Sequence, residues 1–381
     1  MAKKRAIFEE VGAAKPVRGQ PEATGVIDRA ARQGARRAIR LWLYMLFALV
    51  VVMIAVGGLT RLTDSGLSIT EWAPISGAIP PLSADAWQAE FEAYRQIPEY
   101  LLQNRGMTLD EFKVIYWWEW GHRQLGRVIG LVWALGFAGF LVARQIPAGW
   151  TGKLLLLGVL GGLQGAIGWW MVASGLTGEM LDVASYRLAT HLGLAFIILG
   201  LIWWYAMQLS RPQTDLLQAR RGREARLWGL STGALHLCFL QILLGALVAG
   251  IDAGRNYIDW PLMAGGIFPP QPFVIEPLWR NFFENDGLVQ FIHRVTGYVL
   301  VIMVGMVWWA ARRSPNSLTR RAFTDMALVT VLQIVVGIVT VMNSAPWQLA
   351  ILHQLTAVLL WVTILRARFL AGYPVAQSIR G

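Results

Sequence analysis

The fold is decided by the stretch Trp117-Trp118-Glu119-Trp120-Gly121-His122-Arg123-Gln124-Leu125-Gly126. It opens an apolar run whose length predicts a helix that crosses a membrane. The spacing of three residues puts Glu119 and His122 on one face of that helix, and Gly126 follows on the same face one turn later. An ionisable side chain inside a membrane is costly, so Glu119 and His122 are predicted to be functional.

The composition indicates a polytopic membrane protein. The 381 residues are 55% hydrophobic and their mean hydropathy is +0.47, which is too apolar for an ordinary soluble domain. Cys238 is the single cysteine, so no intramolecular disulfide can form. No hydrophobic segment follows the basic N-terminus until about residue 41, so we expect no cleavable signal peptide, and the first span would act as the insertion signal.

Eight segments are long and apolar enough to cross about 30 Å of hydrocarbon. They lie at residues 40–61, 117–142, 153–174, 188–208, 227–250, 289–310, 321–342 and 348–366. The predicted fold class is therefore all-α, with eight transmembrane helices. The two long loops between spans, 62–116 and 251–288, are candidate lids.

Local signals inside the first long loop predict two further helix features. An amphipathic helix is expected near residues 84–95. Thr108 and Glu111 have the spacing of a capping box, which would start a helix that runs on into the second span.

The charges of the loops predict the topology. With the N-terminus inside, the inner segments carry 24 Lys and Arg and the outer ones 6, whereas the acidic residues number 6 inside and 15 outside. The positive-inside rule therefore places both termini in the cytoplasm. It also explains the net charge of +11 as a topology signal, which argues against a nucleic-acid partner.

The predicted organisation has five parts. A basic cytoplasmic tail, 1–39, precedes an N-terminal four-helix half, 40–208. A cytoplasmic linker, 209–226, leads to a C-terminal four-helix half, 227–369, and a cytoplasmic tail, 370–381, ends the chain.

The second half repeats landmarks of the first in the same order. The segments Asp64–Trp72 and Asp252–Trp260 both read Asp-x-Gly-x4-acid-Trp, and His-Arg-x-x-Gly begins at His122 and again at His293. Further pairs are Gln164 with Gln333 and His191 with His353. Because each half has an even number of spans, we expect two tandem four-helix bundles related by a pseudo-two-fold axis along the membrane normal.

The four repeated histidines fall at one depth. His122, His191, His293 and His353 each lie a few residues past the outer entry of their spans, within roughly 10 Å of one level. Two imidazoles facing each other within one bundle suit the two axial positions of a haem iron. A lone intramembrane histidine is more often a packing residue, and His236 fits that description. Zinc or copper would need further ligands.

Other polar residues of the motif have two interpretations each. Arg123 and Arg294 would contact haem propionates, or would reach the membrane surface, and Arg123 has the alternative of an ion pair with Glu119. Gln164, Gln241 and Gln333 are expected to hydrogen-bond between helices.

The two halves differ at one position, where Gln290 replaces Glu119. A carboxyl group beside a porphyrin can exchange protons, and an amide cannot. The first half is therefore predicted to carry out reaction chemistry and the second to hold a fixed haem that passes electrons. The alternative is that Glu119 only forms a structural ion pair with Arg123.

Five motifs together resemble the haem A synthase family, most closely the form of mitochondria and alphaproteobacteria. They are residues 57–72, Glu119-Trp-Gly-His122-Arg, Thr190-His191-Leu-Gly, Ile292-His293-Arg294 and Leu352-His353-Gln354. The resemblance covers nearly the whole chain from residue 40. Some bacterial members have a cysteine pair in the outer loops, and its absence here excludes a thiol mechanism.

The resemblance implies an oxidoreductase that converts the C8 methyl group of haem O to the formyl group of haem A, by successive hydroxylations with water as oxygen source. It implies that His293 and His353 hold a permanent haem b. It also implies that His122 and His191 hold the substrate or product haem, with Glu119 as the catalytic residue.

The same resemblance implies a place in the bacterial inner membrane, with both haem sites near the periplasmic side. Haem O synthase, the farnesylating enzyme, would be a partner beside membrane lipid, and cytochrome oxidase would receive the product. A homo-oligomer stays open. Two other functions also stay open: a di-haem cytochrome b that relays electrons to or from quinone, and a transporter built from parallel repeats.

Overall fold

A computed structural model describes residues 26–178 and 180–375, in which the regular structure is helical apart from an isolated bridge between Met263 and Gly266. Eight helices in this part of the chain are long and apolar enough to cross a membrane. They are α1 (Val26–Leu62), α4 (Leu109–Val142), α5 (Thr151–Val172), α6 (Ser185–Leu209), α8 (Ala225–Gly250), α10 (Asp286–Ala311), α11 (Ser317–Met342) and α12 (Trp347–Gly372). The all-α class and the eight predicted spans are confirmed.

Two helices begin earlier than the hydropathy of the sequence suggests. Helix α1 starts at Val26, inside the predicted basic tail, and its span-forming part is Gln33–Leu62; residues 1–25 of that tail lie outside the described residues. Helix α4 starts at Leu109 behind the predicted capping box. The Thr108 hydroxyl accepts the Glu111 N–H at 3.3 Å, and the Glu111 carboxylate accepts the Thr108 N–H at 2.8 Å.

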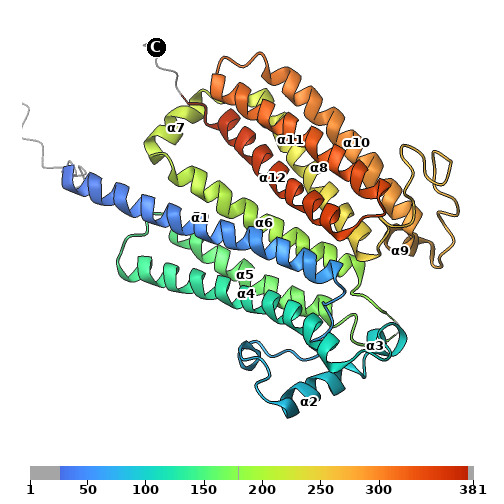
Figure 1. Ribbon diagram of the computed structural model, residues 1–381. Helices are drawn as coiled ribbons and strands as arrows, with labels where there is room; N and C mark the ends of the chain where they lie inside the picture. Colours follow the sequence, from blue (N-terminus) through green and yellow to red (C-terminus); the bar gives the residue numbers. More distant parts are fainter. Residues whose placement is uncertain (1–25, 179, 376–381) are drawn as a thin grey trace, which may run out of the picture.

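Short helices occupy the connections. The first long loop contains η1 (Ser76–Ala78), α2 (Ala84–Tyr94) and α3 (Pro98–Leu102), the linker contains α7 (Gln213–Arg221), and the second long loop contains η2 (Leu278–Arg280) and α9 (Asn281–Glu284). The amphipathic helix expected near 84–95 is thus α2. In Figure 1, α7 and the end of α12 lie at one end of the long helices, and α2, α3 and α9 lie at the other.

The long helices pack in the same order in both halves. In the first half α1 contacts α4 and α6, and α5 contacts α4 and α6; in the second, α8 contacts α10 and α12, and α11 contacts α10 and α12. Figure 1 shows each set of four running side by side. These neighbours are those that two four-helix bundles require. The two-fold axis and the cytoplasmic side of both termini stay predictions.

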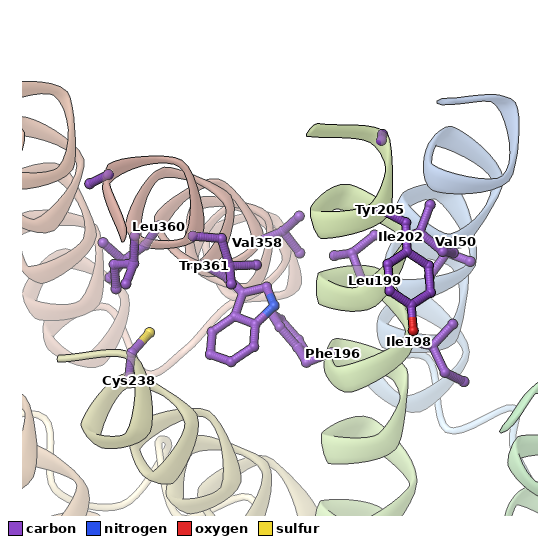
Figure 2. Packing of buried hydrophobic residues seen from close by; sticks show 14 of the residues in the cluster. Val50, Phe196, Ile198, Leu199, Ile202, Tyr205, Cys238, Val358, Leu360 and Trp361 are labelled. Carbon is purple, nitrogen blue, oxygen red and sulfur yellow. The ribbon is translucent and has the colours of Figure 1, made fainter. Parts of the chain in front are cut away.

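The apolar core runs across both halves. It includes Phe196 of α6, Cys238 of α8 and Trp361 of α12, which gather where the two sets of helices meet (Figure 2). The Phe196 and Trp361 rings meet edge to face with centroids 6.2 Å apart. A methyl group at Gly200 would lie 2.8 Å from Nε1 of Trp361, so the glycine permits this close approach of α6 and α12.

Polar contacts also cross between the halves, toward the ends of the helices that carry α2, α3 and α9. The Gln354 amide on α12 donates to the carbonyl of Ile54 on α1 at 2.7 Å. Arg61 on α1 pairs with Asp64 and Asp182 of its own half, and with Asp252 of the second half at 3.2 Å.

Candidate haem-binding sites

The second half brings two of the predicted ligands face to face. The rings of His293 on α10 and His353 on α12 have centroids 6.5 Å apart and planes at 79°. Two imidazoles bonded to one metal through nitrogen, at about 2 Å each, place their centroids roughly 6 Å apart. The pair therefore has the separation of two axial ligands on one iron.

In the first half, His122 on α4 and His191 on α6 stand at the corresponding places. His191 lies within electrostatic range of His122, as His353 does of His293. A methyl group at Gly168 on α5 would lie 2.8 Å from Cε1 of His191, and one at Gly57 on α1 would lie 3.2 Å from Nε2 of His122. Each imidazole thus rests against a glycine on a neighbouring helix.

Three of the imidazoles are also held by a glutamine on a neighbouring helix. Each glutamine lies four residues before the glycine that faces the same ring. Gln164 donates to the backbone carbonyl of His191 at 3.0 Å, Gln241 to that of His293 at 2.9 Å, and Gln333 to that of His353 at 3.2 Å. Each glutamine amide also lies within 3.3 Å of a ring nitrogen of its histidine. The expected bonds between helices therefore end on the candidate ligands.

The residues that surround these histidines fit a haem. The buried Nδ1 of His191 and the buried Oε1 atoms of Gln164 and Gln241 have no hydrogen-bond partner. An imidazole that ligates iron through one nitrogen offers an N–H at the other, and an amide oxygen is a suitable acceptor. Within residues 26–178 and 180–375, no three His, Cys, Asp or Glu side chains group as metal ligands. A porphyrin supplies its own four nitrogens, so two imidazoles complete the iron.

Glu119 lies one turn before His122 and is 2% exposed. Its Oε2 accepts hydrogen bonds from the Ser68 hydroxyl at 2.7 Å and from the Ile69 N–H at 2.8 Å. Its Oε1 pairs with Arg123 at 2.6 Å. The ion pair considered from the sequence is therefore present, and the first long loop holds the second carboxylate oxygen.

Gln290 occupies the equivalent place in the second half, but it donates hydrogen bonds to its loop where Glu119 accepts them. It is also 2% exposed, but its amide donates to the carbonyl of Ala253 at 2.8 Å and to that of Tyr257 at 3.3 Å. Oε1 of Gln290 is buried without a partner. The first half thus presents a carboxylate that accepts from its loop, and the second presents an amide that donates to its loop.

The two motif arginines bind the two long loops. Arg123 donates to the carbonyls of Ile69 and Glu71, and Arg294 donates to those of Tyr257, Asp259 and Leu262. Tyr257 and Asp259 follow Asp252 at the same intervals at which Ile69 and Glu71 follow Asp64, so both arginines hold equivalent backbone. Their contact with haem propionates stays a prediction.

Several contacts of the site had only weak signals in the sequence. The glycines that face the histidines follow a Gln-x3-Gly spacing in α5, α8 and α11, which could have been noticed. The contacts of Glu119 with Ser68 and Ile69 have no such signal, because they depend on how the loop folds back. Nδ1 of His236 donates to the carbonyl of Thr232 on its own helix at 2.8 Å, and its interpretation as a packing residue stays a prediction.

Known proteins resemble this chain over its length. The model of the family described as cytochrome oxidase assembly protein, COX15-CtaA, matches residues 40–365. Proteins named "Heme A synthase" from Dinoroseobacter shibae and Ruegeria pomeroyi are 70% and 67% identical to it, over all of this chain and 99% and 100% of theirs. A protein of that name from Paracoccus denitrificans is 58% identical over 99% of both chains. A match of this extent shows that the chain belongs to the COX15-CtaA family of cytochrome oxidase assembly proteins.

Proposed function

We propose that this protein is a haem A synthase, a membrane oxidoreductase that converts haem O to haem A. The names of its relatives support the activity, and the paired histidines support a haem in each half. The observation that carries the proposal is the buried carboxylate of Glu119 beside one histidine pair, where the other pair has the amide of Gln290.

The residues divide into two sites in this proposal. His122 and His191 hold the substrate haem O and then the product haem A in the first half. His293 and His353 hold a resident haem b in the second half, which when bound supplies a one-electron carrier. The methyl group at C8 becomes a formyl group by successive hydroxylations, with oxygen from water.

Glu119 is the residue proposed to move protons in this reaction. Each hydroxylation by water takes two electrons and two protons from the substrate and water together, so a base beside the reacting carbon is required. The bonds from Ser68 and Ile69 fix one carboxylate oxygen, and Arg123 fixes the other. A positioned carboxylate can accept a proton from the attacking water without reorganising.

The location and partners follow from the same proposal. The eight apolar helices support a place in a membrane, which in this proposal is the bacterial inner membrane. The histidines lie toward the ends of the helices that carry α2, α3 and α9, and the loop charges support the periplasmic side for these ends. Haem O synthase would supply the substrate, and cytochrome oxidase would receive the product.

The test is Glu119→Gln, with Gln290→Glu as the matched control. General acid–base catalysis contributes about 100-fold or more, so Glu119→Gln should retain both haems in its absorption spectrum but lose formyl production by that factor, measured by chromatography of extracted haems. In Gln290→Glu, formyl production in the first half should continue, and haem b should stay unmodified. Full formyl production by Glu119→Gln would remove the catalytic assignment of Glu119, whereas a wild-type protein that binds two haems and forms no formyl group would indicate a di-haem cytochrome that relays electrons.

A further inference from the structure

The four candidate haem ligands are not held alike. His191, His293 and His353 each accept a hydrogen bond at their backbone carbonyl from a glutamine on a neighbouring helix. Each of the three also has that glutamine amide beside its ring and a glycine one turn further along the same helix.

His122 has Met53 where the others have glutamine. Met53 precedes Gly57 by four residues, as Gln241 precedes Gly245, and both pairs keep the same distance in sequence to Asp64 and Asp252. The contacts agree with this alignment. A methyl group at Gly126 would lie 3.5 Å from Cε of Met53, and one at the equivalent Gly297 would lie 3.3 Å from Nε2 of Gln241.

The ring of His122 also lies differently on its glycine. In the three glutamine-held histidines, the ring atom nearest to the glycine is Cε1. In His122 the nearest atom is Nε2, at 3.2 Å from a methyl group placed on Gly57. The ring without a glutamine therefore presents a different edge to its glycine than the other three rings do.

Methionine in place of glutamine removes hydrogen bonds but changes the volume of the side chain little. Both side chains are unbranched and similar in length, but a thioether donates no hydrogen bond and is only a weak acceptor. Partners that hydrogen-bond to a metal ligand fix its orientation, and their loss typically changes metal affinity by about 10- to 100-fold. His122 is thus the least constrained of the four imidazoles.

We propose that Met53 makes His122 the exchangeable ligand through which haem enters and leaves the first half. This rests on the proposed function, in which the first half must take up haem O and release haem A, whereas haem b stays. His191, held by Gln164, retains its orientation and receives each new haem. Met53 is a positioning residue in this proposal, because it acts through His122.

Reciprocal substitutions test the proposal. The full-length chain is purified in detergent with its haems, mixed with excess apomyoglobin, and the transferred haems are followed by absorption and identified by chromatography. Met53→Gln should slow the transfer of the farnesylated haem by about 10-fold, and Gln241→Met should speed the transfer of haem b by a similar factor. Met53→Leu, which adds no donor, should transfer haem at the wild-type rate.

Each outcome decides the matter. Equal transfer rates in wild type, Met53→Gln and Gln241→Met would overturn the inference, while haem in both sites would leave the proposed function intact. A wild-type preparation without haem would overturn both. If Met53→Gln fails to fold, the rate of haem b loss from Gln241→Met decides alone, since the same mechanism predicts it.

Discussion

At the scale of single residues, equivalent positions in the two halves carry side chains of different polarity. Glu119 accepts from Ser68 and Ile69, whereas Gln290 donates to Ala253 and Tyr257. A carboxylate has no donor, so the loop over it must offer N–H or O–H groups, and the loop over an amide can offer carbonyls. The difference in chemistry between the halves is therefore built into both loops as well as into the two helices.

His353→Ala tests the proposed ligand role, with His236→Ala as its control on another span. Loss of one axial imidazole should abolish the low-spin spectrum of haem b, because the 6.5 Å arrangement of His293 and His353 depends on both rings. His236→Ala should leave the absorption spectrum unchanged, since that ring hydrogen-bonds to Thr232 of its own helix and is not one of the four repeated histidines. A normal haem b spectrum in His353→Ala would move the fixed haem to other residues.

At the scale of elements, close packing of helices sets the depth and angle of the imidazoles. Gly168→Ala would place a methyl group 2.8 Å from Cε1 of His191, whereas Gly161, on the same helix, has open space. Alanine favours a helix more than glycine by about 1 kcal/mol. Gly161→Ala should therefore keep or raise the melting temperature and keep bound haem.

Gly168→Ala should lower the haem content of the first half, because the ring or the helix must shift. The measurement is the ratio of farnesylated haem to haem b in extracts of each variant. Equal ratios in Gly168→Ala and Gly161→Ala would show that His191 does not depend on this contact.

The first long loop contains a buried acid, Glu99, which we expect to make stability depend on pH. Glu99 on α3 is 3% exposed and accepts hydrogen bonds from Tyr94 and Asn104. Burial, reinforced by Asp182 and Asp64, raises the pKa of Glu99 to about 8, from an ordinary value of 4.5. The folded protein therefore keeps a proton that the unfolded chain releases, and the contribution of Glu99 to stability is lost as pH rises from 4.5 to about 8.

Glu99→Gln should flatten this part of the pH profile, because an amide does not titrate. Melting temperatures of wild type and variant, followed by tryptophan fluorescence between about pH 4.5 and 9, should converge at the acidic end, with the wild type falling behind as pH rises. Parallel profiles of melting temperature against pH would show that the pKa of Glu99 is the same in the folded and the unfolded protein.

Elements with a local signal could be predicted from the sequence, and contacts made by returning loops could not. The Thr108 capping box and helix α2 follow from their own residues, and the depth of the four histidines follows from the spans. The role of Ser68 depends on the loop that carries it back over α4. Met53 has no distinguishing signal of its own in the sequence, because only the comparison with Gln241 shows that it stands where the second half has a glutamine.

At the scale of the whole molecule, the two halves share one apolar core and one set of polar contacts between them, the polar seam. The apolar contacts of Phe196 and Trp361 lie between α6 and α12, and the polar contacts lie toward the ends of the helices that carry α2, α3 and α9. Gln354 follows the candidate ligand His353 directly and bonds to Ile54 on α1. A methyl group at Gly58, next to Gly57, would collide with its Oε1. The two histidine sites are thus joined by a short run of packed residues, which suits electron transfer between them.

Arg61 is the charged residue of this seam, and its loss should weaken the attachment of the halves. The Arg61 side chain is 12% exposed and lies 3.2–3.9 Å from Asp64, Asp182 and Asp252. Arg61→Ala would leave three carboxylates facing one another. Unfolding should become easier by about 2 kcal/mol, less than for a fully buried pair because solvent screens the carboxylates.

The measurement is the melting temperature of the purified protein, and the matched control is Arg61→Ala combined with Asp252→Asn. Removing one of the three like charges should recover part of the loss, since repulsion rather than missing packing causes it. Burial already raises the pKa of Asp182, and Arg61 opposes that rise. Without Arg61 the Asp182 carboxylate should hold its proton more readily, so the deficit of Arg61→Ala should shrink as pH falls and Asp182 becomes protonated. A deficit that is independent of pH and deepens in the double variant would show that Arg61 acts by packing alone.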